Sequence, residues 1–260
     1  MEFLLAGGHR LEYTLLRPEA PTYGAPTLVF LHEGLGSVAL WKQFPRQVVD
    51  ATGSPALVYS RYGYGKSERL AFARKVDYMH REALDVLPEV LDQLGIEAPV
   101  LIGHSDGASI ALIHAGAGKR PVRGVVAMAP HVFVEDITVQ SIAEAKVTFE
   151  STDLAERLGR YHDDVVSTFR GWNDIWLHPD FRRWNIEEYL ADIRCPVLLI
   201  QGEDDQYGTA AQVEAIARQV SGPVETVVLP DCAHSPHQSI QKDATLAAIA
   251  GFVRDLSEPG

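Results

Sequence analysis

The sequence predicts an α/β fold with a mostly parallel sheet and helices on both faces. Short apolar runs alternate with segments of helical periodicity from residue 27 to residue 128, and the alternation resumes at residue 196. Short continuous apolar runs are typical of strands that are buried on both faces. Strands that alternate with helices form parallel sheets, because each helix returns the chain to the same end of the sheet.

The expected strands are bounded by glycine, proline or polar turn residues, and the first two form a hairpin around Gly7-Gly8. The expected strands span residues 3–6, 11–16, 27–31, 56–59, 99–102, 122–128, 196–200 and 224–229. Apolar residues that recur at spacings of three and four indicate amphipathic helices. The expected helices span about residues 39–49, 78–94, 108–114, 210–220 and 241–255.

The alternation is interrupted between residues 134 and 193, where no strand-like run occurs. A structureless loop of that length is uncommon in a compact domain, so we expect short helices that form a lid. This stretch carries three of the four tryptophans, a density typical of an apolar pocket wall, although core packing explains any one aromatic equally well. We therefore expect a core of residues 1–133 and 194–260 with a lid of residues 134–193.

Composition limits the classes of partner. The 260 residues are enough for one sizeable core, and 35 acidic against 23 basic residues give a formal net charge of −12. An acidic chain is a poor partner for nucleic acid or for an anionic membrane surface. With two cysteines, no leader-like start and no membrane-spanning apolar run, we expect a cytoplasmic protein without membrane association. Its oligomeric state stays open, with a homodimer as one option.

Residues 103–107, Gly-His-Ser-Asp-Gly, join an expected strand to an expected helix. A G-x-S-x-G element in this context exposes its serine on a strained turn, and the glycines leave room for the close approach of backbone. Ser105 is therefore the candidate nucleophile. The N–H of Asp106 lies at a helix N-terminus, where it can donate to an oxyanion. A glycine-rich turn with a capping serine is the structural alternative.

A serine hydroxyl needs a base, and the base needs an acid that fixes its tautomer. Asp205 and His234 each follow an expected strand, and the carboxyl ends of parallel strands share one sheet edge. Helix capping would explain Asp205 alone, and His234 is one of ten histidines. Their joint position and the order Ser, Asp, His favour a triad with Ser105 as nucleophile, Asp205 as acid and His234 as base.

From residue 2 to about residue 256 the chain resembles a lidded α/β-hydrolase fold enzyme. The motifs that carry the resemblance are residues 103–107, Gly202-Glu203-Asp204-Asp205 and Cys232-Ala233-His234. The resemblance implies an eight-stranded type of sheet. It also selects Asp205 over Asp204, because the family's acid generally falls three residues after the glycine of its strand.

The loop at residues 32–37, His-Glu-Gly-Leu-Gly-Ser, resembles the family's His-Gly loop, whose third residue supplies an N–H to the oxyanion hole. By this resemblance the oxyanion hole consists of the N–H groups of Gly34 and Asp106.

One departure concerns Glu33, which stands where the family usually has glycine. Residues 60–67 resemble the family's Asp-x-x-Gly-x-Gly-x-Ser loop, with Ser60 in place of aspartate and Arg61 beside it. The loss of one acid and the gain of another lead us to expect that Glu33 pairs with Arg61 in support of the site. A solvated Glu33 is the alternative.

A serine nucleophile implies an acyl-enzyme, and hence esters, thioesters, lactones or activated amides as substrates. Epoxide hydrolases and dehalogenases of this fold use a carboxylate nucleophile, so Ser105 argues against both. We expect hydrolysis of a small apolar or aromatic carboxylic ester. Thioesters and the carbon-carbon bonds of ring-fission products are the alternatives, and a non-catalytic receptor of the same fold is less favoured.

The lid and the strand ends are expected to enclose a small ester-like molecule. The expected wall residues are Leu35, His131, Trp172, Trp176 and Trp184. We expect no cofactor and no metal, because His234 and His237 with one nearby cysteine are a weak ligand set.

Overall fold

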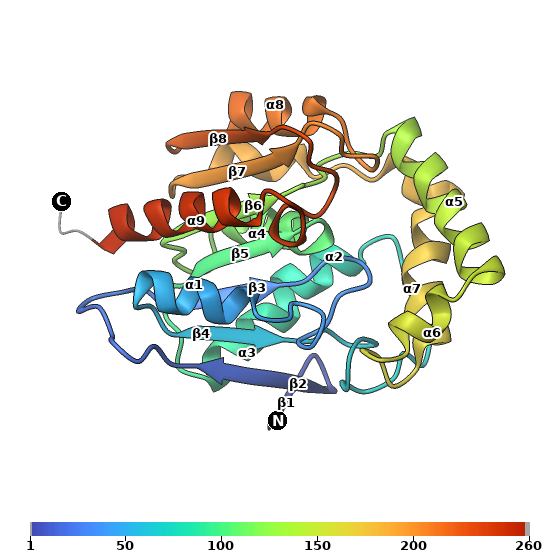
Figure 1. Ribbon diagram of the computed structural model, residues 1–260, viewed down its shortest axis with the longest axis horizontal. Helices are drawn as coiled ribbons and strands as arrows, with labels where there is room; N and C mark the ends of the chain where they lie inside the picture. Colours follow the sequence, from blue (N-terminus) through green and yellow to red (C-terminus); the bar gives the residue numbers. More distant parts are fainter. Residues whose placement is uncertain (1, 258–260) are drawn as a thin grey trace.

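The computed structural model describes residues 2–257. Within them, eight strands form one sheet in the order β1-β2-β4-β3-β5-β6-β7-β8 (Figure 1). The pairs β1–β2 and β2–β4 are antiparallel, and all other neighbours are parallel. The mostly parallel sheet predicted from the alternation of apolar runs and helices is confirmed.

The strands and helices lie close to their expected positions. The strands are β1 (Glu2–Ala6), β2 (His9–Leu16), β3 (Leu28–Leu31), β4 (Ala56–Tyr59), β5 (Val100–His104), β6 (Gly124–Met128), β7 (Val197–Gly202) and β8 (Val224–Leu229). The α-helices are α1 (Phe44–Thr52), α2 (Tyr78–Arg81), α3 (Leu87–Gln93), α4 (Asp106–Ala117), α5 (Asp136–Ser151), α6 (Leu154–Leu158), α7 (Val165–Trp176), α8 (Ala210–Gln219) and α9 (Lys242–Ser257). The short 3-10 and π elements are η1 (Glu82–Val86), η2 (Pro179–Arg183), η3 (Glu187–Asp192) and η4 (Pro236–Gln238).

Alternate side chains of the strands enter two separate apolar layers. In β3, Leu28 and Phe30 pack with α1 and α9, whereas Val29 and Leu31 pack with α3, α4 and α8. Figure 1 shows α1 and α9 in front of the sheet. Because both faces are covered, the inner strands β3, β4 and β6 are apolar at every position rather than at every second one, whereas the edge strand β8 is partly exposed.

The helices α5, α6 and α7 stand beyond the carboxyl ends of the parallel strands (Figure 1). They belong to the stretch for which the sequence predicts short helices and no strand. The end of this stretch returns to the core, because η3 packs on α4: a Cβ at Gly116 would lie 2.7 Å from the Cβ of Tyr189. None of the helices within residues 2–257 is long and apolar enough to cross a membrane.

Two helices differ from their expected form. The helix expected at residues 78–94 consists of α2, the π turn η1 and α3. Pro88 has no N–H to donate to the preceding turn, and a widened turn before it accommodates this loss. The helix expected from residue 39 begins only at Phe44, because Lys42 has a φ of 53° and Pro45 favours a first turn.

Candidate active site

The turn between β5 and α4 holds Ser105 in a strained backbone conformation, with φ 53° and ψ −117°. Two glycines make this turn possible. A Cβ at Gly103 would lie 2.5 Å from the Cα of Ala108, and a Cβ at Gly107 would lie 2.7 Å from the carbonyl oxygen of His32. The turn therefore needs glycine at both positions, and it directs the serine side chain to the sheet edge.

Ser105 lies beside the histidine and the acid that the sequence pairs with it. The Nε2 atom of His234 is 2.9 Å from the hydroxyl of Ser105, and its Nδ1 atom is 2.8 and 2.9 Å from the two carboxylate oxygens of Asp205. A carboxylate only accepts, so Nδ1 carries the proton and Nε2 is left to accept from the serine. This arrangement can draw a proton from the hydroxyl.

Asp205 is held by two further donors. The side-chain amide of Gln201 and the backbone N–H of Tyr207 each donate to its carboxylate at 2.8 Å. Burial opposes its ionisation, but the hydrogen bond and charge of His234 outweigh burial and lower the pKa of Asp205. At Gly202 a Cβ would lie 2.6 Å from the carbonyl oxygen of Ala233, so the turn that carries Asp205 and the turn that carries His234 are in direct contact.

Two backbone N–H groups belong to residues that line the cavity over Ser105. Gly34 and Asp106 both line the cavity there, and neither N–H donates a hydrogen bond within residues 2–257. Both donors are therefore available to an oxyanion. A Cβ at Gly34 would lie 2.9 Å from the Cε2 atom of Trp172, so this loop lies directly beneath α7.

The predicted ion pair between Glu33 and Arg61 is wrong. The fully buried Arg61 donates instead to the backbone carbonyls of His32 and of Glu33, the latter at 3.1 Å. The carboxylate of Glu33 points the other way and lies 3.5 Å from Nδ1 of His104, with its side chain 19 % exposed. Arg61 thus fixes the backbone of the loop that carries Gly34, and it does so without the carboxylate.

The side chain of Asp106 is part of a buried polar cluster that the sequence does not reveal. Its carboxylate accepts from the hydroxyl of Tyr78 at 2.7 Å and from the indole N–H of Trp176 at 3.2 Å. It also lies 3.8 Å from the guanidinium of Arg61. Asp106 therefore connects α4 to Tyr78 of α2, to Trp176 of α7 and to Arg61, which holds the loop of Gly34.

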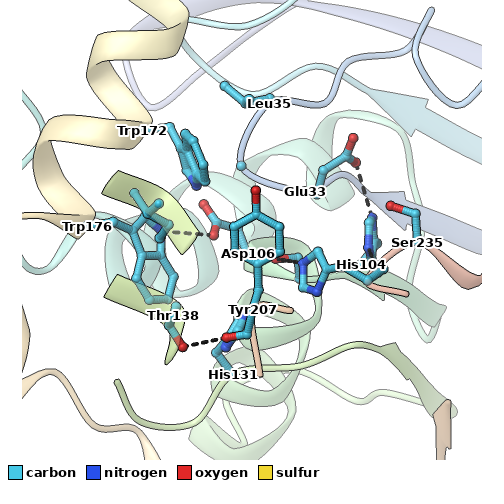
Figure 2. A pocket seen from close by; sticks show the side chains of 14 residues that line it. Glu33, Leu35, His104, Asp106, His131, Thr138, Trp172, Trp176, Tyr207 and Ser235 are labelled. Atoms are coloured by element: carbon cyan, nitrogen blue, oxygen red, sulfur yellow. Dashed lines mark hydrogen bonds and ion pairs between the residues drawn. The ribbon is translucent and has the colours of Figure 1, made fainter. Parts of the chain in front are cut away.

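A cavity of about 180 Å³ opens over Ser105 (Figure 2). Figure 2 shows Trp172, Trp176 and Thr138 on one side of it and Glu33 and His104 on the other. The lining residues are Glu33, Gly34, Leu35, His104, Ser105, Asp106, His131, Thr138, Ile142, Trp172, Trp176, Tyr207, His234 and Ser235.

The sequence model of the alpha/beta hydrolase family matches residues 28–248, which include every residue of the cavity. The chain belongs to the alpha/beta hydrolase family. The family is hydrolytic, which supports hydrolysis as the class of reaction. No curated protein matches the chain by sequence.

Solved structures agree on the fold. A thermophilic esterase from Thermogutta terrifontis superposes with a TM-score of 0.74 at 19% identity over 99% of this chain and 100% of its own. The proline iminopeptidase of Mycobacterium smegmatis gives 0.73 at 19% over 98% of both chains. A meta-cleavage product hydrolase from Pseudomonas fluorescens gives 0.70 at 15% over 98% of both chains. At such low identities the likeness concerns the fold alone.

Four of the five expected wall residues of this hydrolase line the cavity, namely Leu35, His131, Trp172 and Trp176. Trp184 does not. Its ring stacks on Phe181 with centroids 5.4 Å apart, outside the cavity lining. It also packs against Trp176, with ring centroids 6.0 Å apart, so Phe181 and Trp176 surround its ring and the cavity does not.

Five lining residues were missed from the sequence, namely His104, Thr138, Ile142, Tyr207 and Ser235. Thr138 and Ile142 are the buried residues of α5, and their spacing of four, which places them on one helix face, was the available signal. Tyr207 follows Asp205 by two residues, and this nearness in the sequence was the available signal.

His131 adds a polar group to the apolar wall of this hydrolase. Burial, and then the neighbouring His234, lower its pKa to about 3, so the imidazole is neutral at ordinary pH. Within residues 2–257, no group of three or more His, Cys, Asp and Glu side chains is arranged to hold a metal ion.

Proposed function

We propose that the protein is a serine hydrolase that cleaves small apolar or aromatic carboxylic esters through an acyl-enzyme. The observation that carries the proposal is the hydrogen-bonded series from Ser105 through His234 to Asp205, next to two unengaged N–H groups.

In the proposed reaction, Oγ of Ser105 attacks the ester carbonyl carbon while His234 accepts the hydroxyl proton. The carbonyl oxygen becomes an oxyanion that accepts from the N–H groups of Gly34 and Asp106. His234 then gives the proton to the departing alcohol, and the acyl group stays on the serine. A water molecule then attacks the acyl carbon while His234 accepts a proton from it. His234 returns this proton to Oγ of Ser105, which releases the carboxylic acid and restores the hydroxyl.

The size and lining of the cavity support a small substrate. A dry cavity of about 150 Å³ holds a benzene molecule. The cavity over Ser105, at about 180 Å³, therefore encloses a group close in size to one aromatic ring. The indoles of Trp172 and Trp176 and the side chain of Ile142 make its walls apolar.

The test is Ser105→Ala together with a substrate panel. We expect the variant to fold normally and to lose kcat by a factor of about 10⁶, because the nucleophile is absent. A fluorophosphonate should label the wild type and not the variant. Ser221→Ala, which changes an exposed serine, should be labelled like the wild type.

The panel compares aryl and short alkyl esters with long-chain esters, thioesters and vinylogous diketones. We expect the highest kcat/KM for esters with a single ring or a short acyl chain. Turnover of thioesters or diketones in preference to esters would contradict the ester assignment. Wild-type labelling of Ser105→Ala would contradict the choice of nucleophile.

A further inference from the structure

His104 contacts two different loops of the site at once. It is the last residue of β5 and is 1 % exposed. Its Nε2 atom is 2.8 Å from the backbone carbonyl oxygen of His234, and its Nδ1 atom is 3.5 Å from the Glu33 carboxylate. Figure 2 shows the Glu33 carboxylate directed at the His104 ring. The loop of Gly34 and the turn of His234 are therefore joined through the residue that precedes Ser105.

The geometry fixes the protonation of the ring. A carbonyl only accepts, so Nε2 of His104 must carry a proton. A neutral ring would then turn the lone pair of Nδ1 toward the carboxylate, which is repulsive, whereas an imidazolium presents a second N–H. Burial opposes the charge on both groups. Glu33 outweighs burial at His104 and raises the pKa of His104, and the imidazolium outweighs burial at Glu33 and holds the pKa of Glu33 well below its ordinary value.

None of the other titratable groups near Glu33 and His104 neutralises the charge of either residue. The titratable groups near the pair are His32 on the loop of Glu33, Asp205 after β7, His234 on the turn after β8, His237 on η4, His131 after β6 and His162 before α7. Burial is the main cause that lowers the pKa of His131 to about 3 and also lowers the pKa of His162. Burial is the main cause that lowers the pKa of His237 to about 3 and the pKa of His32 well below its ordinary value, so both rings are neutral. The Asp205 carboxylate already accepts a hydrogen bond from His234. Glu33 and His104 are thus each other's counter-ions.

The loop is shaped for this carboxylate. A Cβ at Gly36 would lie 2.5 Å from the Oε2 atom of Glu33 and 2.6 Å from the Cβ of His32. Only glycine leaves the space that the Glu33 side chain occupies. The loop therefore accommodates a carboxylate that is directed away from Arg61 and toward β5.

We propose that Glu33 and His104 form a positioning ion pair that holds the loop of Gly34 and the turn of His234 in register with Ser105. The proposal rests on the proposed function, because it assigns the pair to the same site. The pair aligns an oxyanion donor and the base, and it touches no reacting atom. A displacement of about 1 Å at such groups costs about 10²-fold in rate.

The test is Glu33→Gln, which keeps the shape of the side chain and removes its charge, together with His104→Gln and the double variant. For each single variant we expect kcat to fall by about 10- to 100-fold with KM changed by less than about threefold. Because the two residues act as a unit, the double variant should lose about as much as one single variant. Losses that multiply, or an unchanged kcat in Glu33→Gln, would overturn the proposal.

A matched control is available at the surface. His9 and Glu68 form a His–Glu contact of 2.8 Å far from the site, with side chains 34 % and 45 % exposed. His9→Gln should leave kcat unchanged. An increase in KM for cationic esters in Glu33→Gln, without a loss of kcat, would show instead that the carboxylate binds substrate, and the proposal would fall.

The pH dependence of stability is a readout that needs no turnover. The lowered pKa of Glu33 stabilises the fold above its ordinary value of 4.5, and the raised pKa of His104 stabilises it below its ordinary value of 6.5. The His104 contribution is then lost as pH rises through the folded pKa. The difference in Tm between wild type and Glu33→Gln should therefore be largest between about pH 4.5 and 6.5 and should shrink at higher pH. A difference that is the same at every pH would contradict the ion pair.

Failure of the two proposals can be told apart by fluorophosphonate labelling of wild type. A wild type that is not labelled at Ser105 refutes the serine mechanism, whatever Glu33→Gln does. Normal labelling of wild type, combined with equally fast labelling of Glu33→Gln, refutes only the positioning pair.

Discussion

Two buried aspartates lie at the same sheet edge, Asp205 after β7 and Asp106 at the start of α4. Asp205 is 8 % exposed and faces the imidazole of His234, a group that can gain a proton and that borders the cavity. Asp106 is 0 % exposed and faces a phenol, an indole and a guanidinium. The two carboxylates are thus both buried, and they differ mainly in the groups that they contact.

This difference indicates what each carboxylate can do. Burial, and then Asp106, raise the pKa of Tyr78 well above its ordinary value, so the phenol keeps its proton throughout the physiological range. A guanidinium and an indole do not titrate there either. Asp106 can therefore hold α4, α2 and α7 together without taking part in proton transfer. Asp205 faces the one partner whose charge changes in the proposed reaction.

The largest expected effect is that of Asp205→Asn. The amide can stabilise the wrong tautomer of His234, and we expect kcat to fall by about 10⁴-fold while the fold is retained. Steady-state kinetics and thermal unfolding check this. Asp204→Asn, which changes the adjacent exposed residue, is the control and should be mild. The reverse ranking would assign the acid to Asp204.

A smaller effect on rate and a larger effect on stability are expected of Asp106→Asn. The substitution leaves the buried charge of Arg61 without its counter-ion, so the free energy of unfolding should fall by about 3 kcal/mol. Urea denaturation measures the loss, with Asp174→Asn on the exposed face of α7 as the control. A loss of kcat comparable to that of Asp205→Asn with unchanged stability would remove the distinction between the two aspartates.

The smallest effect is expected of Trp176→Phe. It keeps an aromatic ring and removes the N–H that donates to Asp106 at 3.2 Å, so stability should fall by about 1 to 2 kcal/mol. Trp184→Phe is the matched control, because the buried Nε1 of Trp184 has no hydrogen-bond partner within residues 2–257. Equal losses in the two variants would show that ring volume, and not the hydrogen bond, explains the effect.

Local sequence determined the parts of this protein whose geometry follows from a few neighbouring residues. Apolar runs predicted the parallel strands, and the glycines at 103 and 107 predicted the strained turn that carries Ser105. The carboxyl ends of parallel strands share one edge, so the sequence also predicted that Asp205 and His234 would lie near Ser105.

Only the tertiary structure decided which partner each long side chain reaches. Glu33 and Arg61 follow neighbouring strands, yet their charged ends point in opposite directions, one to His104 and the other under the loop to backbone carbonyls. Likewise Thr138 reaches the cavity because α5 is placed over the strand ends. Strand position is set by periodicity within a few residues, whereas the direction of a side chain depends on rotamers that the packed surroundings select.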